Sequence, residues 1–111
     1  MAQDSLSQVF AALADPTRRA ILSRLSEGAA TVGQVAEMFA ISAPAISQHL
    51  KVLERVGLVE RTTTAQWRTL TLRPEPLDAV AEWVDHHRRD WDQRLDRLEA
   101  HLDTINEEEY Q

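Results

Sequence analysis

The sequence predicts a mainly α-helical protein with one small β-hairpin, in the order four helices, two strands and one long final helix. Three observations support this fold class. Up to Gly57, apolar residues recur every three or four positions, which is the period of an amphipathic helix. From Leu58 to Leu72, two short runs of strand-forming residues are separated by a polar tip. The length of 111 residues suits one domain with a modest core, so we expect a single domain over residues 1–111.

The first two predicted helices meet at the pair Asp15-Pro16. Asp15 is a favourable N-cap, and Pro16 is tolerated in the first turn because the first N–H groups of a helix have no acceptor within it. Gly28 is placed to end the second helix in a left-handed conformation. The expected inward stripes are Leu6, Val9, Phe10, Leu13 and Ala14 in the first helix and Ile21, Leu22 and Leu25 in the second.

The third and fourth predicted helices have the spacing of a helix-turn-helix. Thr31 and Gln34 have the spacing of a capping box, and Ser42 caps a helix over residues 42–56 with Pro44 in its first turn. Only two residues, Ala40 and Ile41, separate the two helices. The expected inward residues are Val35, Ala36 and Phe39 in the third helix and Ile46, Leu50 and Leu53 in the fourth.

The outward face of helix 42–56 carries small and hydrogen-bonding side chains near its start and a cation further along. A helix that enters the major groove of DNA needs such residues for close approach, for reading base edges and for binding phosphate. The pattern leaves two interpretations open, a DNA-reading face and the solvated face of an ordinary amphipathic helix. The candidate DNA-binding residues of this helix are Ser42, Ala43, Pro44, Ser47, Gln48 and Lys51.

The hairpin over residues 58–72 follows this helix directly, which is the arrangement of a winged helix-turn-helix. Arg61, Gln66 and Arg68 flank a tip, Thr62 to Ala65, that carries no charge, and we expect them to contact the DNA backbone. Trp67 could pack at the base of the hairpin or contact a sugar, and we favour packing.

Charge is distributed unevenly along the chain, whose formal net charge is −6. Residues 1–74 hold eight Lys and Arg against six Asp and Glu, whereas residues 75–111 hold four against twelve. The net charge therefore does not exclude nucleic acid as a partner of the first two-thirds. Some cations are expected to be engaged within the protein, since Arg55 and Arg61 have Glu54 and Glu60 beside them in the sequence. The cations expected on the DNA side are Lys51, Arg55, Arg61 and Arg68, with Arg18 or Arg19 if the second helix approaches the DNA.

The last predicted helix, over residues 75–106, has an apolar heptad pattern that Arg88 interrupts. A helix of this length cannot be buried by so small a core, so we expect it to pair with the same helix of a second subunit. The first helix is expected to contribute to this homodimer as well. The candidate dimerisation residues are Leu77, Val84, Trp91, Leu95, Leu98 and Leu102.

Four segments together resemble the ArsR-type winged-helix repressors of bacteria: ALADPTRRAIL, TVGQVAEMF, SAPAISQHLKVLERVGLV and the AQWR wing. The resemblance covers nearly the whole chain from about Val9. RPEPLDAVAEWV and the Trp-x-x-Arg-Leu-x-x-Leu segment are similar to a cysteine-free branch often encoded beside START-like (SRPBCC) proteins. Membership implies a homodimer that binds a palindromic operator and represses transcription, often of its own gene. His49 matches a family position and is interpreted as a half-buried residue that bridges helix and backbone.

Several classes of site and location are excluded or disfavoured. The absence of cysteine excludes disulfides, thiolate metal sites and a cysteine nucleophile. Asp85, His87 and His101 fit three positions of a metal site known in the family, but Leu98 stands where its other histidine belongs. We therefore favour solvent-facing histidines and no cofactor. Apolar runs of at most six residues and a start without signal-peptide features predict a cytoplasmic protein with no membrane association.

The main alternative is an interaction module whose last helix binds a different protein and which has lost affinity for DNA. The weakly charged wing favours this alternative, and the intact helix 42–56 disfavours it. An enzyme is not expected, because residues two apart on a helix, such as Ser47 and His49, do not face each other. No residue pattern identifies the inducer or the operator sequence.

Overall fold

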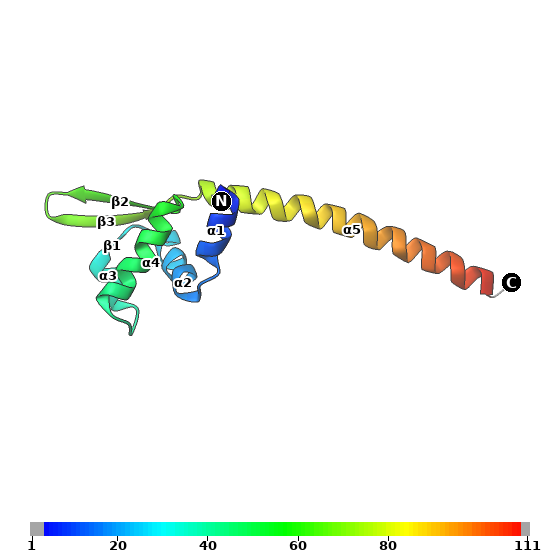
Figure 1. Ribbon diagram of the computed structural model, residues 1–111, viewed down its shortest axis with the longest axis horizontal. Helices are drawn as coiled ribbons and strands as arrows, with labels where there is room; N and C mark the ends of the chain where they lie inside the picture. The colour runs from blue at the N-terminus through cyan, green and yellow to red at the C-terminus, as the bar shows by residue number, and fades with distance from the viewer. Residues whose placement is uncertain (1–3, 110–111) are drawn as a thin grey trace. The chain divides into compact units, whose positions relative to one another are not determined.

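The computed structural model describes residues 4–109 and consists of five α-helices and three short β-strands within that range. The chain divides into two compact units, residues 1–80 and 81–111, which are described separately below. The elements, labelled in Figure 1, are α1 (Ser5–Leu13), α2 (Pro16–Ser26), β1 (Ala30–Thr31), α3 (Val32–Glu37), α4 (Ala43–Arg55), β2 (Val59–Thr64), β3 (Trp67–Leu72) and α5 (Glu75–Glu109).

The predicted helix starts are confirmed by their cap geometry. The Asp15 carboxylate accepts the backbone N–H of Arg18 at 3.0 Å, and the Ser42 hydroxyl accepts that of Ala45 at 3.3 Å. Thr31 and Gln34 form both hydrogen bonds of a capping box. These side chains satisfy N–H groups that lack a partner within the helix, so they fix where α2, α3 and α4 begin.

The inward stripe predicted for the first helix is partly wrong. Val9 and Ala12 are the buried residues of α1, whereas Phe10 keeps 37% of its surface exposed. The burial of Ala12 is not predicted, because a methyl side chain contributes little to the hydrophobic pattern. The stripes predicted for α2 and α4 are confirmed, since Ile21, Leu22 and Leu25 are buried in the first and Ile46, Leu50 and Leu53 in the second.

The sheet contains one strand more than the predicted hairpin. Its order is β1-β3-β2, with both pairs antiparallel, and Ala30 of β1 lies opposite Leu70 of β3. A strand of two residues is too short to produce an alternating pattern, so β1 left no signal in the sequence. Its pairing anchors the start of α3 to the middle of β3.

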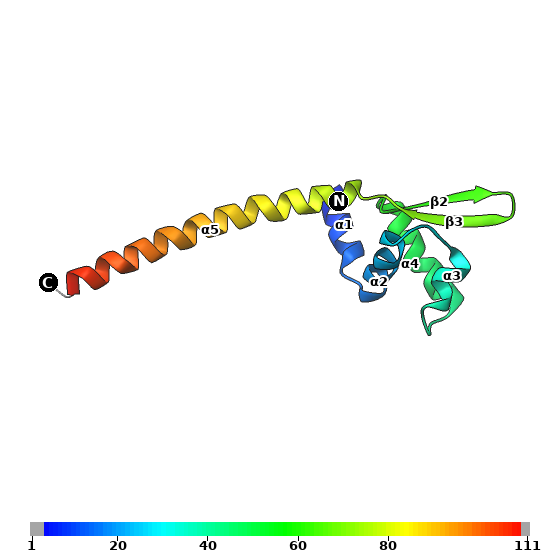
Figure 2. The same cartoon turned by 180° about the vertical axis from the view of Figure 1, so that it is seen from behind.

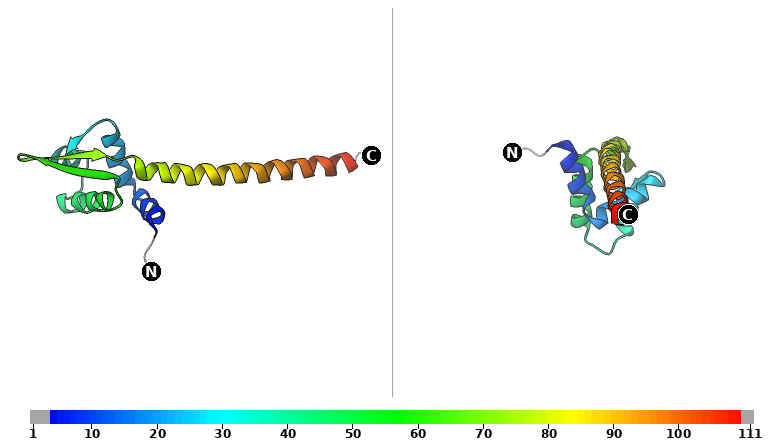
Figure 3. Two further views of the ribbon diagram at one scale, coloured as in Figure 1. Left: turned by 90° about the horizontal axis from the view of Figure 1, so that it is seen from above. Right: turned by 90° about the vertical axis from the view of Figure 1, so that its right-hand side faces the viewer.

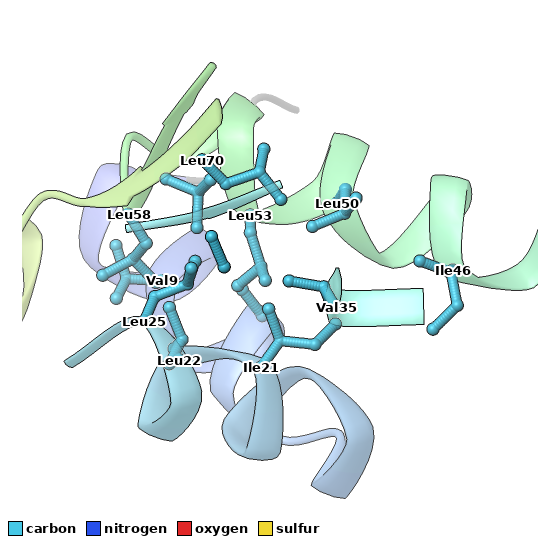
Figure 4. Close-up of a cluster of buried hydrophobic side chains, with 13 residues drawn as sticks. Val9, Ile21, Leu22, Leu25, Val35, Ile46, Leu50, Leu53, Leu58 and Leu70 are labelled. Atoms are coloured by element: carbon cyan, nitrogen blue, oxygen red, sulfur yellow. The ribbon is translucent and has the colours of Figure 1, made fainter. Parts of the chain in front are cut away.

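The core of the first unit is formed by apolar side chains from α1 to α4 and from the sheet (Figure 4). Leu50 and Leu53 of α4 meet Leu58 and Leu70 there, each with no exposed surface. No polar or charged side chain is fully buried among the residues whose burial is described. Hydrophobic burial therefore fixes α4 and the hairpin onto one body and leaves their outer faces exposed.

The second unit is the continuation of α5, which extends to Glu109, three residues beyond the predicted end. The helix has 35 residues, a length of about 52 Å at the usual rise. From Val84 onward its predicted seam is exposed within a single chain, with 60% exposure at Trp91 and 52% at Leu98. Leu77, at the start of the predicted seam, is instead half-buried and packs against the core of the first unit. None of the helices within residues 4–109 combines the length and apolarity needed to cross a lipid bilayer.

Candidate nucleic-acid interface

The outward face of α4 carries the side chains that the sequence predicts for reading DNA. Gln48, Lys51 and Arg55 are exposed, and Ser47 is half-buried beside them. In the part of the chain that the structure describes, the side chains of Gln48 and Lys51 make no hydrogen bond or ion pair, so both are available for an external partner. Ser42, Ala43 and Pro44 lie at the exposed start of the helix, and the Ser42 hydroxyl already accepts the capping bond.

The hairpin of β2 and β3, which we call the wing, projects beyond the helices of the first unit with its turn at the free end (Figures 1 and 3). The turn is shorter than predicted, because Thr62, Thr63 and Thr64 belong to β2 and only Ala65 and Gln66 connect the strands. Ala65 has a φ of +55°, a left-handed conformation that costs an L-residue free energy. The tip is thus a tight two-residue turn rather than a polar loop.

The strand register separates the wing residues onto two faces. Thr63 lies opposite Arg68, and both share a face with Val59 and Leu70, which are buried further along the strands. Thr64 lies opposite Trp67, on the other face. Arg68 and Gln66 are exposed, so the wing carries one exposed cation next to its turn.

The expectation that Trp67 packs at the base of the hairpin is wrong. The side chain is 61% exposed because it pairs with Thr64 beside the turn, where no helix of the first unit covers the sheet. An exposed indole costs hydrophobic free energy in the isolated chain. Trp67 therefore adds an exposed aromatic side chain to the tip, beside Arg68 and Gln66.

The guanidinium of Arg61, a predicted DNA contact, binds a carboxylate within the protein. Its Nε donates to Oε1 of Glu54 at 2.9 Å and its Nη2 to Oε2 at 3.4 Å, with both side chains about three-quarters buried. This bidentate pair connects β2 to α4. Arg73 forms an ion pair with Glu60 at the surface. Glu54 and Glu60 both bind cations, but not those expected: the partner of Glu54 is Arg61 and not its neighbour Arg55, and the partner of Glu60 is Arg73. The pair with Glu54 weakens Arg61 as a phosphate contact.

Arg18 and Arg19 do not extend from the start of α2 as free cations. Arg18 donates from Nε to the carbonyl of Ala12 at 2.7 Å, and Arg19 donates to the carbonyl of Leu13 at 2.7 Å. Both arginines therefore satisfy carbonyl groups at the end of α1, which have no partner within that helix. The suggestion that they bind the DNA backbone is not supported by this geometry.

The half-buried position predicted for His49 is confirmed, and its ring faces the start of α2. Its Nδ1 lies 3.3 Å from Nη1 of Arg18 and 3.8 Å from the carboxylate of Asp15. The backbone N–H of Arg18 lowers the pKa of Asp15, and the nearby His49 lowers it further.

The candidate metal ligands lie on α5. No group of three or more His, Asp or Glu residues within residues 4–109 is arranged to hold a metal ion in one chain. His87 donates from Nδ1 to the carbonyl of Trp83 at 2.9 Å, and its ring stacks on Trp83 at 4.1 Å. Because such a site would draw Asp85 and His87 from one subunit and His101 from another, the preference for solvent-facing histidines stays a prediction.

The sequence is similar to those of known transcriptional regulators. A helix-turn-helix domain model matches residues 13–62. The chain is 37% identical over 79 residues to the transcriptional repressor SdpR of Bacillus subtilis, covering 71% of this chain and 88% of that protein. It is 42% identical over 81 residues to the HTH-type transcriptional regulator Rv2034 of Mycobacterium tuberculosis, covering 73% of this chain and 76% of that protein.

Solved structures agree with this placement. The crystal structure of an ArsR family transcriptional regulator matches with a TM-score of 0.75 and 39% identity, over 83% of this chain and 97% of that one. An ArsR-like transcriptional regulator from Rhodococcus sp. RHA1 matches with a TM-score of 0.73 and 31% identity, over 85% and 89%. These relatives are transcriptional regulators and not enzymes. The chain belongs to the ArsR family of DNA-binding helix-turn-helix transcriptional regulators.

Proposed function

We propose that the protein is a homodimeric repressor that binds a palindromic operator through α4 and the wing of each subunit. The observation that carries this proposal is the division of α4 into two faces. Ile46, Leu50 and Leu53 are buried. Gln48 and Lys51 on the opposite side are exposed, and their side chains make no hydrogen bond or ion pair within the described residues. A helix held to its domain by one face and offering hydrogen-bonding groups on the other suits the major groove.

Within this proposal, the residues of α4 divide into those that read bases and those that position the helix. Gln48 and Ser47 read base edges, and the Gln48 amide suits the paired donor and acceptor of adenine. Ser42, Ala43 and Pro44 allow close approach to the DNA because their side chains are small. Lys51 binds phosphate, which adds affinity without sequence information.

The wing contacts the DNA backbone through Arg68 and Gln66. Arg61 stiffens the base of the wing by its pair with Glu54 and is assigned no more than a secondary phosphate contact. The exposed indole of Trp67 lies against a sugar beside the turn, where apolar contact and the indole N–H both find partners. One cation per wing predicts modest electrostatic affinity.

A homodimer follows from the seam of α5, defined by Leu77, Val84, Trp91, Leu95, Leu98 and Leu102. In this proposal residues 1–111 act as one DNA-binding domain, and residues 75–106 pair with a second copy, with a contribution from α1. Two recognition helices about 34 Å apart then read half-sites about 10 base pairs apart.

The finer features of the resemblance are part of the proposal. The chain represents the cysteine-free branch encoded beside START-like proteins, acts on its own promoter in the cytoplasm, and needs no cofactor. The histidines of α5 face solvent. Repression follows if the operator overlaps a promoter, since a bound dimer then excludes polymerase.

A gel shift with DNA from upstream of its own gene tests the proposed function. The full chain should retard this DNA in the presence of excess unrelated duplex, and Lys51→Ala should weaken the complex on both sequences. Failure of the wild-type protein to bind either DNA would favour the alternative, an interaction module that binds a different protein through α5.

A further inference from the structure

One arginine side chain joins three helices of the first unit. From the first turn of α2, Arg18 donates to the carbonyls of Ala11 at 3.1 Å and Ala12 at 2.7 Å, both at the end of α1. Its remaining nitrogen, Nη1, lies 3.3 Å from Nδ1 of His49 on α4. Figure 2 shows α2 next to both α1 and α4. Arg18 thus connects the recognition helix to the last turn of α1.

The chemistry of this contact fixes the state of the histidine ring. A guanidinium has donors and no acceptor, so Nδ1 of His49 must accept, and the ring proton of neutral His49 is on Nε2. The Asp15 carboxylate, 3.8 Å from the same Nδ1, is already bonded to the backbone N–H of Arg18. Asp15 and Arg18 are the charged groups that face His49 from α2, and the sequence of α1 contains no ionisable side chain.

The position of His49 on α4 links its contact with Arg18 to the orientation of the helix. His49 follows Gln48, which is exposed, and precedes Leu50, which is fully buried. Burial of the apolar seam fixes which face of α4 lies inward, but hydrophobic contact is not directional, so the finer orientation of the helix depends on directional bonds such as hydrogen bonds. Among the described residues, two side-chain pairs hold α4 to other elements of the first unit by hydrogen bonds: Glu54 with Arg61 near its end and His49 with Arg18 near its middle.

We propose that Arg18 and His49 are positioning residues for DNA recognition: their hydrogen bond sets the orientation in which α4 presents Gln48 and Ser47. The inference rests on the proposed function and adds to it. His49 contacts no base in this scheme. Because Arg18 also bonds the end of α1, a change in α1 reaches the recognition helix through one side chain.

The first test replaces the acceptor. In His49→Asn an amide oxygen lies near the place of Nδ1 and can accept from Arg18, whereas His49→Ala has no acceptor. The full-length dimer carrying His49→Ala should lose affinity for the operator by about tenfold, the size expected for one hydrogen bond to a charged donor. Its affinity for unrelated DNA should change far less. His49→Asn should keep most of the operator affinity, and His86→Ala, at an exposed histidine of α5, should behave as wild type.

The second test measures how the preference for operator over unrelated DNA depends on pH. A residue with no part in positioning α4 would not change this dependence. Protonated Nδ1 cannot accept from Arg18 and carries a charge of the same sign. The preference of the wild-type protein for operator over unrelated DNA should therefore fall as the imidazole protonates. The preference of His49→Asn should fall less over the same range, since the amide at position 49 does not titrate.

Thermal unfolding of each variant identifies loss of folding at the assay temperature. If His49→Ala is folded and binds operator as tightly as wild type, the positioning role is overturned. If His49→Ala does not fold, the two pH profiles decide, and a parallel fall in wild type and His49→Asn overturns the proposal. Failure of the wild-type protein to bind any DNA overturns the proposed function itself, which is a separate result.

Discussion

The two units of the chain differ in how their apolar side chains are covered. In residues 1–80, the side chains of α1 to α4 and the sheet bury one another, and Leu50, Leu53, Leu58 and Leu70 have no exposed surface. In residues 81–111, the seam of α5 exposes 44% to 60% of each of Val84, Trp91, Leu95, Leu98 and Leu102. The apolar core of the first unit is covered within one chain, whereas the seam of the second unit is left exposed, which is the pattern of an interaction surface.

A Leu→Ala substitution in each unit should give the largest difference in the free energy of unfolding and in its dependence on protein concentration. Leu50→Ala leaves a cavity in a closed core and should lower the free energy of unfolding by about 2–5 kcal/mol at any protein concentration. Leu98→Ala removes a side chain that is 52% exposed in one chain, so its cost should depend on protein concentration. Urea unfolding at two concentrations separated by a hundredfold measures both. A concentration-independent loss at Leu98 would contradict the assignment of the seam.

A substitution at Gln48 tests whether the exposed face of α4 reads the base sequence. Gln48→Ala should weaken binding to the operator by about 1–3 kcal/mol and relax the preference at one base pair of each half-site. The measurement is a set of binding titrations against operators that carry single base changes. Equal weakening on every sequence would make Gln48 a backbone contact. Arg55→Ala, on the same exposed face, serves as the control for a loss without sequence preference.

Variants of the wing test how many positive charges of the first unit contact DNA phosphates. Changing Thr63 and Thr64 to Arg adds two cations to each wing, but the two positions lie on opposite faces, so we expect one of them per subunit to reach phosphate. Two added phosphate contacts per dimer should make log Kd depend more steeply on log salt than in wild type, by about 2 in slope. Wild type itself should show a modest slope of about 4 to 5 in magnitude, from two or three phosphate contacts per subunit. Identical slopes would show that the turn stays away from phosphate.

The smallest expected effect concerns acid stability of the first unit. The pKa of Asp15 is lowered in the folded protein, mainly by the backbone N–H of Arg18. Its contribution to stability is therefore complete above the ordinary Asp pKa of 3.8 and is lost as the pH falls through the lower folded value. Asp15→Asn keeps the N-cap without the charge, so the difference in Tm between wild type and variant should shrink on acidification. A difference that is constant down to pH 2.5 would contradict this assignment.

Asp4 provides a matched control for Asp15. It caps α1 as Asp15 caps α2, and the backbone N–H of Ser7 lowers its pKa in the same direction. Asp4→Asn should show the same dependence on pH, without the part that His49 contributes at Asp15.

The sequence predicted those features that depend on neighbours along the chain. Asp15, Thr31 and Ser42 were identified as caps because a cap acts within three residues, and the seam of α4 followed from its period. The strand β1 has two residues and no period, so it could not be seen. Trp67 was misplaced because its exposure depends on which elements lie behind the hairpin.

The ion pairs show why the candidate site was predicted less fully than the fold. Glu60 precedes Arg61 in the chain, yet Arg61 pairs with Glu54 and Glu60 pairs with Arg73. Neighbours on a strand point to opposite faces, so Glu60 and Arg61 cannot meet. The packing of β2 on α4 brings Glu54 to Arg61, and the pairing of β2 with β3 brings Arg73 to Glu60. Such pairing depends on tertiary geometry that local patterns do not contain.

Sedimentation of the wild-type protein and of a variant with Leu95 and Leu98 both changed to Glu tests the central claim most directly. The account predicts that wild type sediments at twice the chain mass of 12.6 kDa, and that the variant becomes monomeric or insoluble. Arg97→Glu, a charge change on the same helix outside the seam, should leave the dimer intact. A folded, dimeric Leu95→Glu/Leu98→Glu variant would contradict the claim that a second copy covers the seam.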